Sequence, residues 1–380
     1  MKNLVLLSAL SSISNLTIMG KMSHPFSPHP VFVGMQNGIR NTLTFRNFHL
    51  YNNYAPLVKG YFSSLILKDS VFQNSPQPLS GITTSKTLTI DKKKINETTA
   101  EFSNETLIIT NCLFEDCRCE DSNGGAINGQ KSIVQIANTT FQYCTSEKGG
   151  AIYLTGSKVT FDNVNFTTNL AMATCGAAYF HDCDVDITRG FSVSNSAIEG
   201  NGCFSFESST VNIKMHHFIR NNANAACGCV FSQNSNMMIN DSYFIHNHGA
   251  SRSGAIEIFY TQNVIIHNCT FISNEITNGD STNVVIEGDS NVTFSNCTFD
   301  AQFQTVVEYY SFGTQTVQKK DIIIDLNPPN PFYMIVDVID DVLFQEVILS
   351  HKKSDAFTIL MLVSVPIFVV AAFALLHFTK

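Results

Sequence analysis

A repeat of about 26 residues occupies the middle of this 380-residue chain and constrains its fold more than any other feature. Its clearest copies are VQIANTTFQYCTSEKGGAIYL, which starts at Val134, and VTFDNVNFTTNLAMATCGAAYF, which starts at Val159. Both fit the template V-x-I/F-x-N-x-x-F-x-x-N/C, followed by a variable stretch and then G-G/A-A. The anchor phenylalanines are Phe114, Phe141, Phe166, Phe191, Phe218, Phe244, Phe271 and Phe299, and the motif glycines are Gly125, Gly150, Gly176, Gly202, Gly228 and Gly254. Such a period is typical of a solenoid.

The apolar residues within one copy are spaced for strands rather than helices. Val159 and Phe161 are two positions apart, and so are Ile152 and Leu154, which is the periodicity of a β-strand. Val, Ile, Phe and Thr dominate these runs, and Asn or Gly separates them, so that one copy holds about three short strands. We predict an all-β parallel β-helix whose coils stack about 4.8 Å apart and bury their apolar side chains only against one another.

The repeat also resembles a known family. The motif G-G-A-I occurs at 124–127 and 149–152. It alternates with F-x-x-N at 166–169, 218–221, 244–247 and 271–274. This alternation is similar to the repeats of the polymorphic outer-membrane proteins and of some protist surface proteins. The resemblance implies a right-handed β-helix that is displayed on a cell surface and used for adhesion.

Composition and flanking segments indicate where such a protein resides. The net charge of −8 argues against nucleic acid as a partner, and eleven cysteines suit an oxidising compartment. Residues 1–22 begin with Lys2 and LVLLSAL, which is typical of a signal peptide. We assign residues 23–326 to the β-helix, with an inserted loop at 91–105, where the rhythm of the repeat stops. This loop is either a binding loop or a plain solvated excursion.

The C-terminal part predicts a membrane anchor. Residues 327–355 begin with NPPNP and read as a linker and juxtamembrane segment. Residues 356–376 carry no charge over a length that spans a bilayer, and a short tail, 377–380, follows. We predict a single-pass plasma-membrane protein with an extracellular solenoid. The lysines around the span favour the opposite orientation, so a cytosolic solenoid stays as an alternative.

No group of residues predicts catalysis or a cofactor. Asp182, Asp184 and Asp186 alternate and are a weak metal candidate, but one coil supplies too few oxygens for calcium, which favours a polar turn. Glu207 and Glu257 lie two coils apart, roughly 10 Å, which is too far for a retaining glycosidase pair. The histidines fall at different template positions and are expected to be solvated turn residues; they are His216, His217, His246, His248 and His267.

An outward column of aromatic residues is the best binding candidate. Three residues after the second motif glycine, successive coils place Tyr153, Tyr179 and Phe231 in one line, with Ser205 between the last two and Glu257 beyond. A row of exposed aromatic side chains can hold a sugar or a partner protein. The alternative is that flanking segments cover the column.

Equal template positions in neighbouring coils also predict cysteine pairs. The stacked pairs are Cys117–Cys144, Cys203–Cys229 and Cys269–Cys297, whose Cα atoms would be within disulfide range. We predict that Cys203–Cys229, on the outward side, is the pair most prone to oxidation.

Asparagines recur three residues before the anchor, where the chain must turn. Their side chains tolerate left-handed backbone angles, so we predict a ladder in which each amide bonds its neighbours. Its members are Asn111, Asn138, Asn163, Asn268 and Asn296, with Asp241 in the same register, and a second column holds Asn169, Asn221, Asn247 and Asn274. Asn138, Asn268 and Asn296 begin glycosylation sequons, as do Asn96 and Asn104. We expect glycans at Asn96 and Asn104, because a ladder would enclose the others.

The function predicted from these features is adhesion, or binding of an extracellular protein or glycan. A carbohydrate-active β-helix enzyme is the alternative from another class, and loss of activity on changing Asp182 and Asp184 would favour it.

Overall fold

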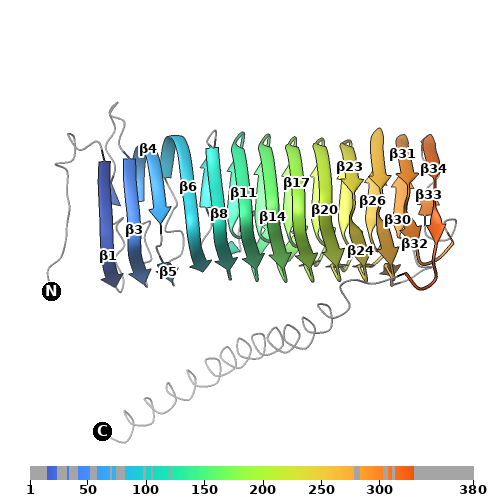
Figure 1. Cartoon of the computed structure of the whole chain (residues 1–380), viewed down its shortest axis with the longest axis horizontal. Helices are drawn as coiled ribbons and strands as arrows, with labels where there is room; N and C mark the ends of the chain where they lie inside the picture. The colour runs from blue at the N-terminus through green and yellow to red at the C-terminus, as the bar shows by residue number, and fades with distance from the viewer. Residues whose placement is uncertain are drawn as a thin grey trace, which may run out of the picture. The chain divides into compact units, whose positions relative to one another are not determined.

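The computed structural model describes residues 15–23, 32–33, 42–51, 58–68, 71–73, 82–96, 100–103, 106–119, 122–277, 283–302, 307–309 and 313–328, with side chains from Leu107 onward. The chain divides into two units, Met1–Pro328 and Pro329–Lys380, and the second lies outside the described residues. The first unit is a solenoid of parallel strands, in which β8, β11, β14, β17 and β20 of successive coils lie side by side (Figure 1).

Within the described residues the strands form three sheets. The sheet of 19 strands holds β1 (Asn15–Ser23), β2 (Phe32–Val33), β3 (Thr42–Tyr51), β4 (Val58–Lys68), β5 (Val71–Gln73), β6 (Ile82–Asn96), β8 (Thr106–Glu115), β11 (Ile133–Gln142), β14 (Lys158–Thr167), β17 (Asp184–Val193), β20 (Thr210–Ile219), β23 (Asn236–Asn240), β24 (Tyr243–Ile245), β27 (Asn263–His267), β28 (Thr270–Ile272), β31 (Ser290–Ser295), β32 (Thr298–Phe299), β34 (Gln315–Lys320) and β35 (Ile323–Ile324). The sheet of nine strands holds β7 (Ala100–Ser103), β10 (Ile127–Gln130), β13 (Ile152–Thr155), β16 (Ala178–His181), β19 (Phe204–Glu207), β22 (Val230–Gln233), β26 (Ile256–Phe259), β30 (Val284–Glu287) and β33 (Val307–Tyr309). The sheet of seven strands holds β9 (Arg118–Cys119), β12 (Thr145–Lys148), β15 (Leu170–Thr174), β18 (Ser196–Ala197), β21 (Asn222–Ala223), β25 (His248–Gly249) and β29 (Glu275–Ile276).

The repeat sets the register between coils. Strand β11 pairs in parallel with β14, so that Val134 lies opposite Val159 and Phe141 lies opposite Phe166. Copies of the template therefore superpose residue on residue, as the sequence predicts. The motif glycines are required because the turn passes directly under the next coil: a Cβ on Gly202 would overlap the carbonyl oxygen of Gly228.

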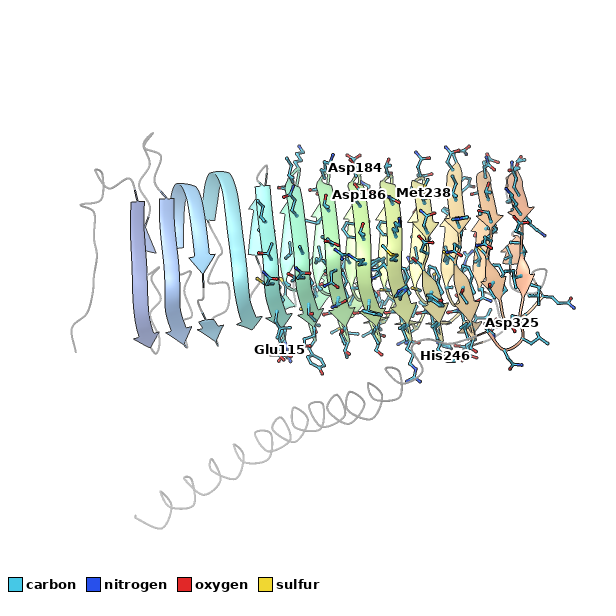
Figure 2. All side chains as sticks on the ribbon, in the orientation of Figure 1. Glu115, Asp184, Asp186, Met238, His246 and Asp325 are labelled. Carbon is cyan, nitrogen blue, oxygen red and sulfur yellow. The ribbon has the colours of Figure 1, made fainter. Side chains whose placement is uncertain are left out.

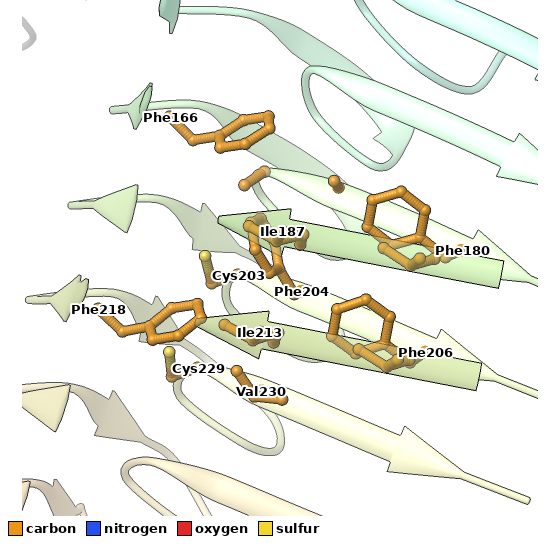
Figure 3. Close-up of a cluster of buried hydrophobic side chains, with 14 of the residues drawn as sticks. Phe166, Phe180, Ile187, Cys203, Phe204, Phe206, Ile213, Phe218, Cys229 and Val230 are labelled. Atoms are coloured by element: carbon orange, nitrogen blue, oxygen red, sulfur yellow. The ribbon is translucent and has the colours of Figure 1, made fainter. Parts of the chain in front are cut away.

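Stacked phenylalanines fill the core, and one predicted anchor is wrong. Ring centroids are 4.7 Å apart for Phe114–Phe141, 5.3 Å for Phe141–Phe166, 4.8 Å for Phe218–Phe244, 5.0 Å for Phe244–Phe271 and 4.7 Å for Phe271–Phe299. Between the two runs, Ser192 and not Phe191 stands in register with Phe166. The space left by this small residue is filled from the nine-stranded sheet by Phe204, whose ring contacts Phe166 and Phe218 edge-on (Figure 3).

One histidine belongs to this core, contrary to the expectation that the histidines are solvated. His216 is fully buried. Its Nδ1 donates to the carbonyl oxygen of Arg189 at 3.2 Å, and Nε2 accepts from the hydroxyl of Ser192 at 2.8 Å. Burial lowers the pKa of His216 to about 3, so the imidazole is neutral.

The predicted inserted loop at 91–105 is largely strand. β6 runs through Asn96 and pairs with β8, which places Ile95 opposite Phe114, while Phe72 lies opposite Ile95 on the other side. β7 follows at Ala100–Ser103. The chain therefore makes two coils between Phe72 and Phe114, and Ile95 occupies the anchor position of the first. The predicted glycosylation site Asn96 ends β6, and Asn104 lies outside the described residues.

The predicted cysteine pairs stack but are not bonded. The amide N–H of Cys203 donates to the carbonyl of Cys229 at 3.2 Å, yet the cysteines are free thiols, and this pair is fully buried in the core rather than on the outward side. In-register residues of a parallel sheet have parallel Cα–Cβ bonds, so their Cβ atoms stay about 4.8 Å apart, beyond the usual disulfide range. Cys117–Cys144 and Cys269–Cys297 are stacked in the same way.

Both asparagine columns form ladders. In the outer one, Asn163 Nδ2 donates to Asn138 Oδ1 at 3.0 Å and Asn296 Nδ2 to Asn268 Oδ1 at 2.9 Å, all with positive φ as predicted. This ladder is partly or fully exposed, so it does not enclose its sequons as expected. The inner one is buried and also includes Asn195; its Nδ2–Oδ1 bonds join Asn169–Asn195 (2.8 Å), Asn195–Asn221 (2.9 Å), Asn221–Asn247 (3.0 Å) and Asn247–Asn274 (2.9 Å).

The predicted signal peptide, residues 1–22, is described only where β1 begins, and the predicted span, residues 356–376, lies outside the described residues. Within the part of the chain that the structure describes, no helix is long and apolar enough to cross a bilayer.

Candidate functional site

The predicted aromatic column lies on the outer face of the nine-stranded sheet. The register of β13, β16, β19 and β22 aligns Tyr153 with Tyr179, Ser205 and Phe231 on four successive coils. The rings of Tyr153 and Tyr179 stack at 5.0 Å with an angle of 3° between their planes. Parallel in-register strands impose this geometry, because each side chain repeats the orientation of the one below.

The column is only partly accessible. Tyr153 and Phe231 are half-buried, Tyr179 is 8% exposed, and Ser205 between them is fully buried. Because the stacked rings face one another, they present edges and hydroxyl groups outward rather than open faces. The column is therefore neither a continuous exposed stripe nor fully covered, which is intermediate between the two alternatives that the sequence left open.

The carboxylate of Glu207 lies near the two tyrosines. Glu207 lies on the next coil, one outward position further along the strand, where His181 Nδ1 approaches Glu207 Oε2 at 3.6 Å. Burial raises the pKa of the Tyr179 phenol, and a hydrogen bond to Glu207 adds to the rise. Burial also raises the pKa of Tyr153, with Glu207 as the second cause. We name Tyr153, Tyr179, His181 and Glu207 the tyrosine–glutamate cluster.

A second group of charges lies further along the same sheet, with Glu257 two coils beyond Glu207. Glu257 continues the aromatic column and is 5% exposed. Its Oε1 is 3.8 Å from Nη1 of Arg252, and the same guanidinium bonds Glu287 on the following coil. Burial raises the pKa of Glu257 to about 7; Arg252 opposes this rise, and Glu287 adds to it. The repeat pattern does not predict Arg252 and Glu287, because they come from a turn and from a different outward position.

The three aspartates do not converge. Asp184 and Asp186 lie on one face of β17, with Asp184 Oδ2 3.7 Å from Lys158 Nζ and Asp186 Oδ1 3.3 Å from Asn212 Nδ2 (Figure 2). Asp182 precedes the strand in a turn with φ of 54°. Among the residues that the structure describes, no three His, Cys, Asp or Glu side chains are grouped to hold a metal ion.

Comparisons with known proteins agree with the architecture. Residues 150–322 match the model of the family described as right handed beta helix region. No curated protein matches the chain. Among solved structures, the catalytic unit of the thermostable GH87 alpha-1,3-glucanase from Streptomyces thermodiastaticus strain HF3-3 is similar, with 13% identity and a TM-score of 0.43 over 81% of this chain. The match spans 61% of that enzyme's chain. Residues 150–322 are thus similar to right-handed β-helices, as the family resemblance implies.

Proposed function

We propose that this protein is a non-catalytic binding protein, whose β-helix recognises a glycan or a glycosylated partner through the nine-stranded sheet. The tyrosine–glutamate cluster is the observation that carries the proposal. It combines two stacked phenol rings with a carboxylate and an imidazole, and the side chains of Glu207 and His181 remain 29% and 48% exposed. Tyrosine offers apolar area and a hydrogen-bonding group together, which suits ligands that carry both C–H surfaces and hydroxyl groups.

Rigidity supports a role in recognition. The coils of Tyr153 and Tyr179 are held in register by the stacked rings of Phe141 and Phe166. The inner asparagine ladder continues to the coil of Glu207, where Phe204 packs against Phe166. Binding groups on such a scaffold lose little conformational freedom when a ligand binds. The site is therefore pre-formed rather than assembled on contact.

The proposed location is the cell surface. A signal peptide at 1–22 and a membrane span at 356–376 would make a single-pass plasma-membrane protein with an extracellular solenoid and glycans at Asn96 and Asn104. Protease treatment of intact cells tests this topology. Cleavage of the solenoid is expected, and a solenoid that stays protected until the cells are lysed would contradict it.

A screen of the purified full-length chain against a glycan array and whole cells tests the binding function. We expect Tyr153→Ala and Glu207→Gln each to weaken binding to the ligand that the screen identifies. Met238→Ala and Asp186→Asn are matched controls, because they make the same kinds of change on the outer face of the 19-stranded sheet (Figure 2). Equal binding by all four variants would remove the cluster as the binding site.

The charged group around Glu257 favours a second candidate, a carbohydrate-active enzyme. A carboxyl group with a pKa of about 7 beside the carboxylate of Glu287 is suited to donate a proton at neutral pH. Release of reducing ends from polyuronides and neutral glucans, measured for the wild type, Glu257→Gln and Asp184→Asn, decides between the candidates. Hydrolysis that Glu257→Gln abolishes would favour the enzyme, whereas no release by the wild type favours the binding protein.

A further inference from the structure

A second row of aromatic side chains lies on the outer face of the 19-stranded sheet. Phe191 on β17 and His217 on β20 are in register, and Tyr243 on β24 follows on the next coil. The ring centroids are 5.5 Å apart for Phe191–His217 and 5.2 Å apart for His217–Tyr243. All three side chains are half-buried. We name Phe191, His217 and Tyr243 the outer strip.

The outer strip is confined to three coils. The three preceding coils place Leu113, Thr140 and Asn165 at the same position, and the three coils that follow place Thr270, Thr298 and Ile323 there. The fold accepts small polar residues in this column, so the stacking of the coils does not require aromatic rings. Their presence on three consecutive coils therefore needs another explanation, and a ligand is one that the chemistry supports.

Apolar residues accompany the outer strip. Two residues further along each strand stand Val193, Ile219, Ile245 and Ile272, which are buried but lie outside the phenylalanine core. The same position in the preceding coils holds Gln142 and Thr167. This position is thus polar in the preceding coils, apolar over the coils that carry the strip and the one after them, and polar again at Asp300.

Hydrogen-bonding groups border both sides of the outer strip. On one side, Arg189 Nε donates to Asp162 Oδ1 at 2.8 Å. On the other, Arg220 and His246 occupy the turn that follows the strands, where His246 is exposed (Figure 2). The arrangement is an aromatic centre with polar margins. Carbohydrates fit such surfaces, because their C–H faces pack on aromatic rings while their hydroxyl groups bond to the margins.

The size of the outer strip selects a linear ligand rather than a protein. Three side chains on successive coils span roughly 10 Å at the coil spacing of ~4.8 Å. A stable protein interface buries about 800 Å² and involves 20–30 residues on each partner, far more than the strip provides. One aromatic side chain per coil instead matches a chain of sugar rings that runs along the solenoid axis.

We propose that the outer strip binds a linear neutral oligosaccharide, at a site separate from the tyrosine–glutamate cluster. The imidazole of His217 is neutral there, because burial lowers its pKa to about 4, so it bonds hydroxyl groups without adding charge. This site is additional to the one proposed on the nine-stranded sheet. Either proposal can be refuted without affecting the other.

The chain contains no tryptophan, which makes a direct assay available. Phe191→Trp places a single fluorescent indole in the outer strip while keeping an aromatic ring. The full-length variant is titrated with linear neutral hexasaccharides of β-1,4-linked glucose, β-1,4-linked xylose, β-1,3-linked glucose and β-1,4-linked N-acetylglucosamine. We expect a saturable shift of the emission with at least one of them.

Two further variants complete the test. In the Phe191→Trp background, His217→Thr with Tyr243→Thr should weaken binding about tenfold or more, because two apolar contacts are removed. Threonine occupies this column naturally, so the fold should survive, and circular dichroism checks this. Tyr153→Ala should leave the titration unchanged.

Absence of a shift with all four hexasaccharides would overturn the proposal, and so would equal binding after His217→Thr with Tyr243→Thr. A strip that captures a protein and no glycan would overturn it as well. Loss of all glycan binding in Tyr153→Ala, with normal binding by the threonine variant, would leave the cluster as the binding site and exclude the strip. The reverse result would support the strip and remove the cluster.

Discussion

Removal of one amide from the buried asparagine ladder should destabilise the solenoid far more than removal of an exposed one. Asn221 is fully buried, and its side chain makes four hydrogen bonds with nitrogen and oxygen atoms, besides a longer one from Nδ2 to Cys229 Sγ at 3.9 Å. Oδ1 accepts from the backbone N–H and from Nδ2 of Asn195, at 3.0 and 2.9 Å, while Nδ2 donates to the carbonyl of Ser192 at 2.9 Å and to Asn247 Oδ1 at 3.0 Å. Asn221→Ala would remove these four bonds in a site closed to water. The backbone N–H of Asn195 and the carbonyl of Ser192 would lose their side-chain partner, whereas Asn195 Nδ2 would keep its bond to the carbonyl of Phe166 and Asn247 Oδ1 would keep the bond from the backbone N–H at position 221.

The magnitude follows from the number of groups left unpaired. Each buried unsatisfied polar group costs about 1–3 kcal/mol. Neighbouring groups relax and the individual costs do not add fully, so we expect a loss of about 3–5 kcal/mol in the free energy of unfolding. Asn212 on the same coil is the matched control. It is exposed and bonds Asp186 through one contact of 3.3 Å, so Asn212→Ala should cost no more than about 0.5 kcal/mol.

Urea unfolding of the full-length chain, followed by circular dichroism, measures both values. Hydrogen exchange of the amides around the ladder would show whether the damage stays local, as solenoids permit. A difference below about 1 kcal/mol between the two variants would refute the reasoning, because the ladder amides would then contribute no more than exposed ones.

Three further changes test other parts of the fold. Phe204→Ala should lower the free energy of unfolding in urea by about 3–5 kcal/mol, because it empties the space beside Ser192. Phe191→Ser should lower it by about 1 kcal/mol or less, and equal losses would show that Phe191 belongs to the core. Gly202→Ala should abolish native circular dichroism or lower the melting temperature strongly, since a Cβ has no space there, and an unchanged melting curve would contradict the turn geometry. His216 has a folded-state pKa of about 3 against about 6.5 when unfolded, so its contribution to stability is complete above pH 6.5 and is lost as the pH falls toward 3. His216→Ser should therefore flatten the fall in unfolding free energy between pH 6.5 and 4, and an unchanged slope would show that His216 is not the titrating group.

The coil could be predicted from the repeat because the residues that shape each coil are close together in the sequence and recur regularly. Alternating apolar residues and turn-forming asparagines recur at one spacing, so the register of Val134 with Val159 and the positive φ of Asn138 followed from the sequence. The predicted register was wrong at one coil, because the residue that matches the motif there is not the one that packs in the core. Phe191 looks like an anchor, but Ser192 holds the anchor position and the missing volume comes from Phe204 on another strand. No pattern within one repeat reveals such a compensation.

The candidate sites were predictable only in part, for a similar reason. The alignment of Tyr153 with Tyr179 follows from register alone. Its partner Glu207 lies at a different outward position, and Arg252 comes from a turn whose path the repeat does not determine. The expected Cys203–Cys229 disulfide failed because equal register fixes the Cα spacing but keeps the Cβ atoms too far apart.

A binding protein releases its glycan intact, whereas an enzyme shortens it, and the mass of the bound glycan distinguishes the two. The purified full-length chain is incubated with the glycans that it retains on an array, and the bound material is then eluted and weighed by mass spectrometry. We expect every retained glycan to be recovered at its original mass, and Tyr153→Ala with Glu207→Gln, or the threonine variant of the outer strip, to reduce the amount recovered. Recovery of shortened glycans from the wild type, and of intact ones from Glu257→Gln, would contradict binding without cleavage and identify the protein as an enzyme.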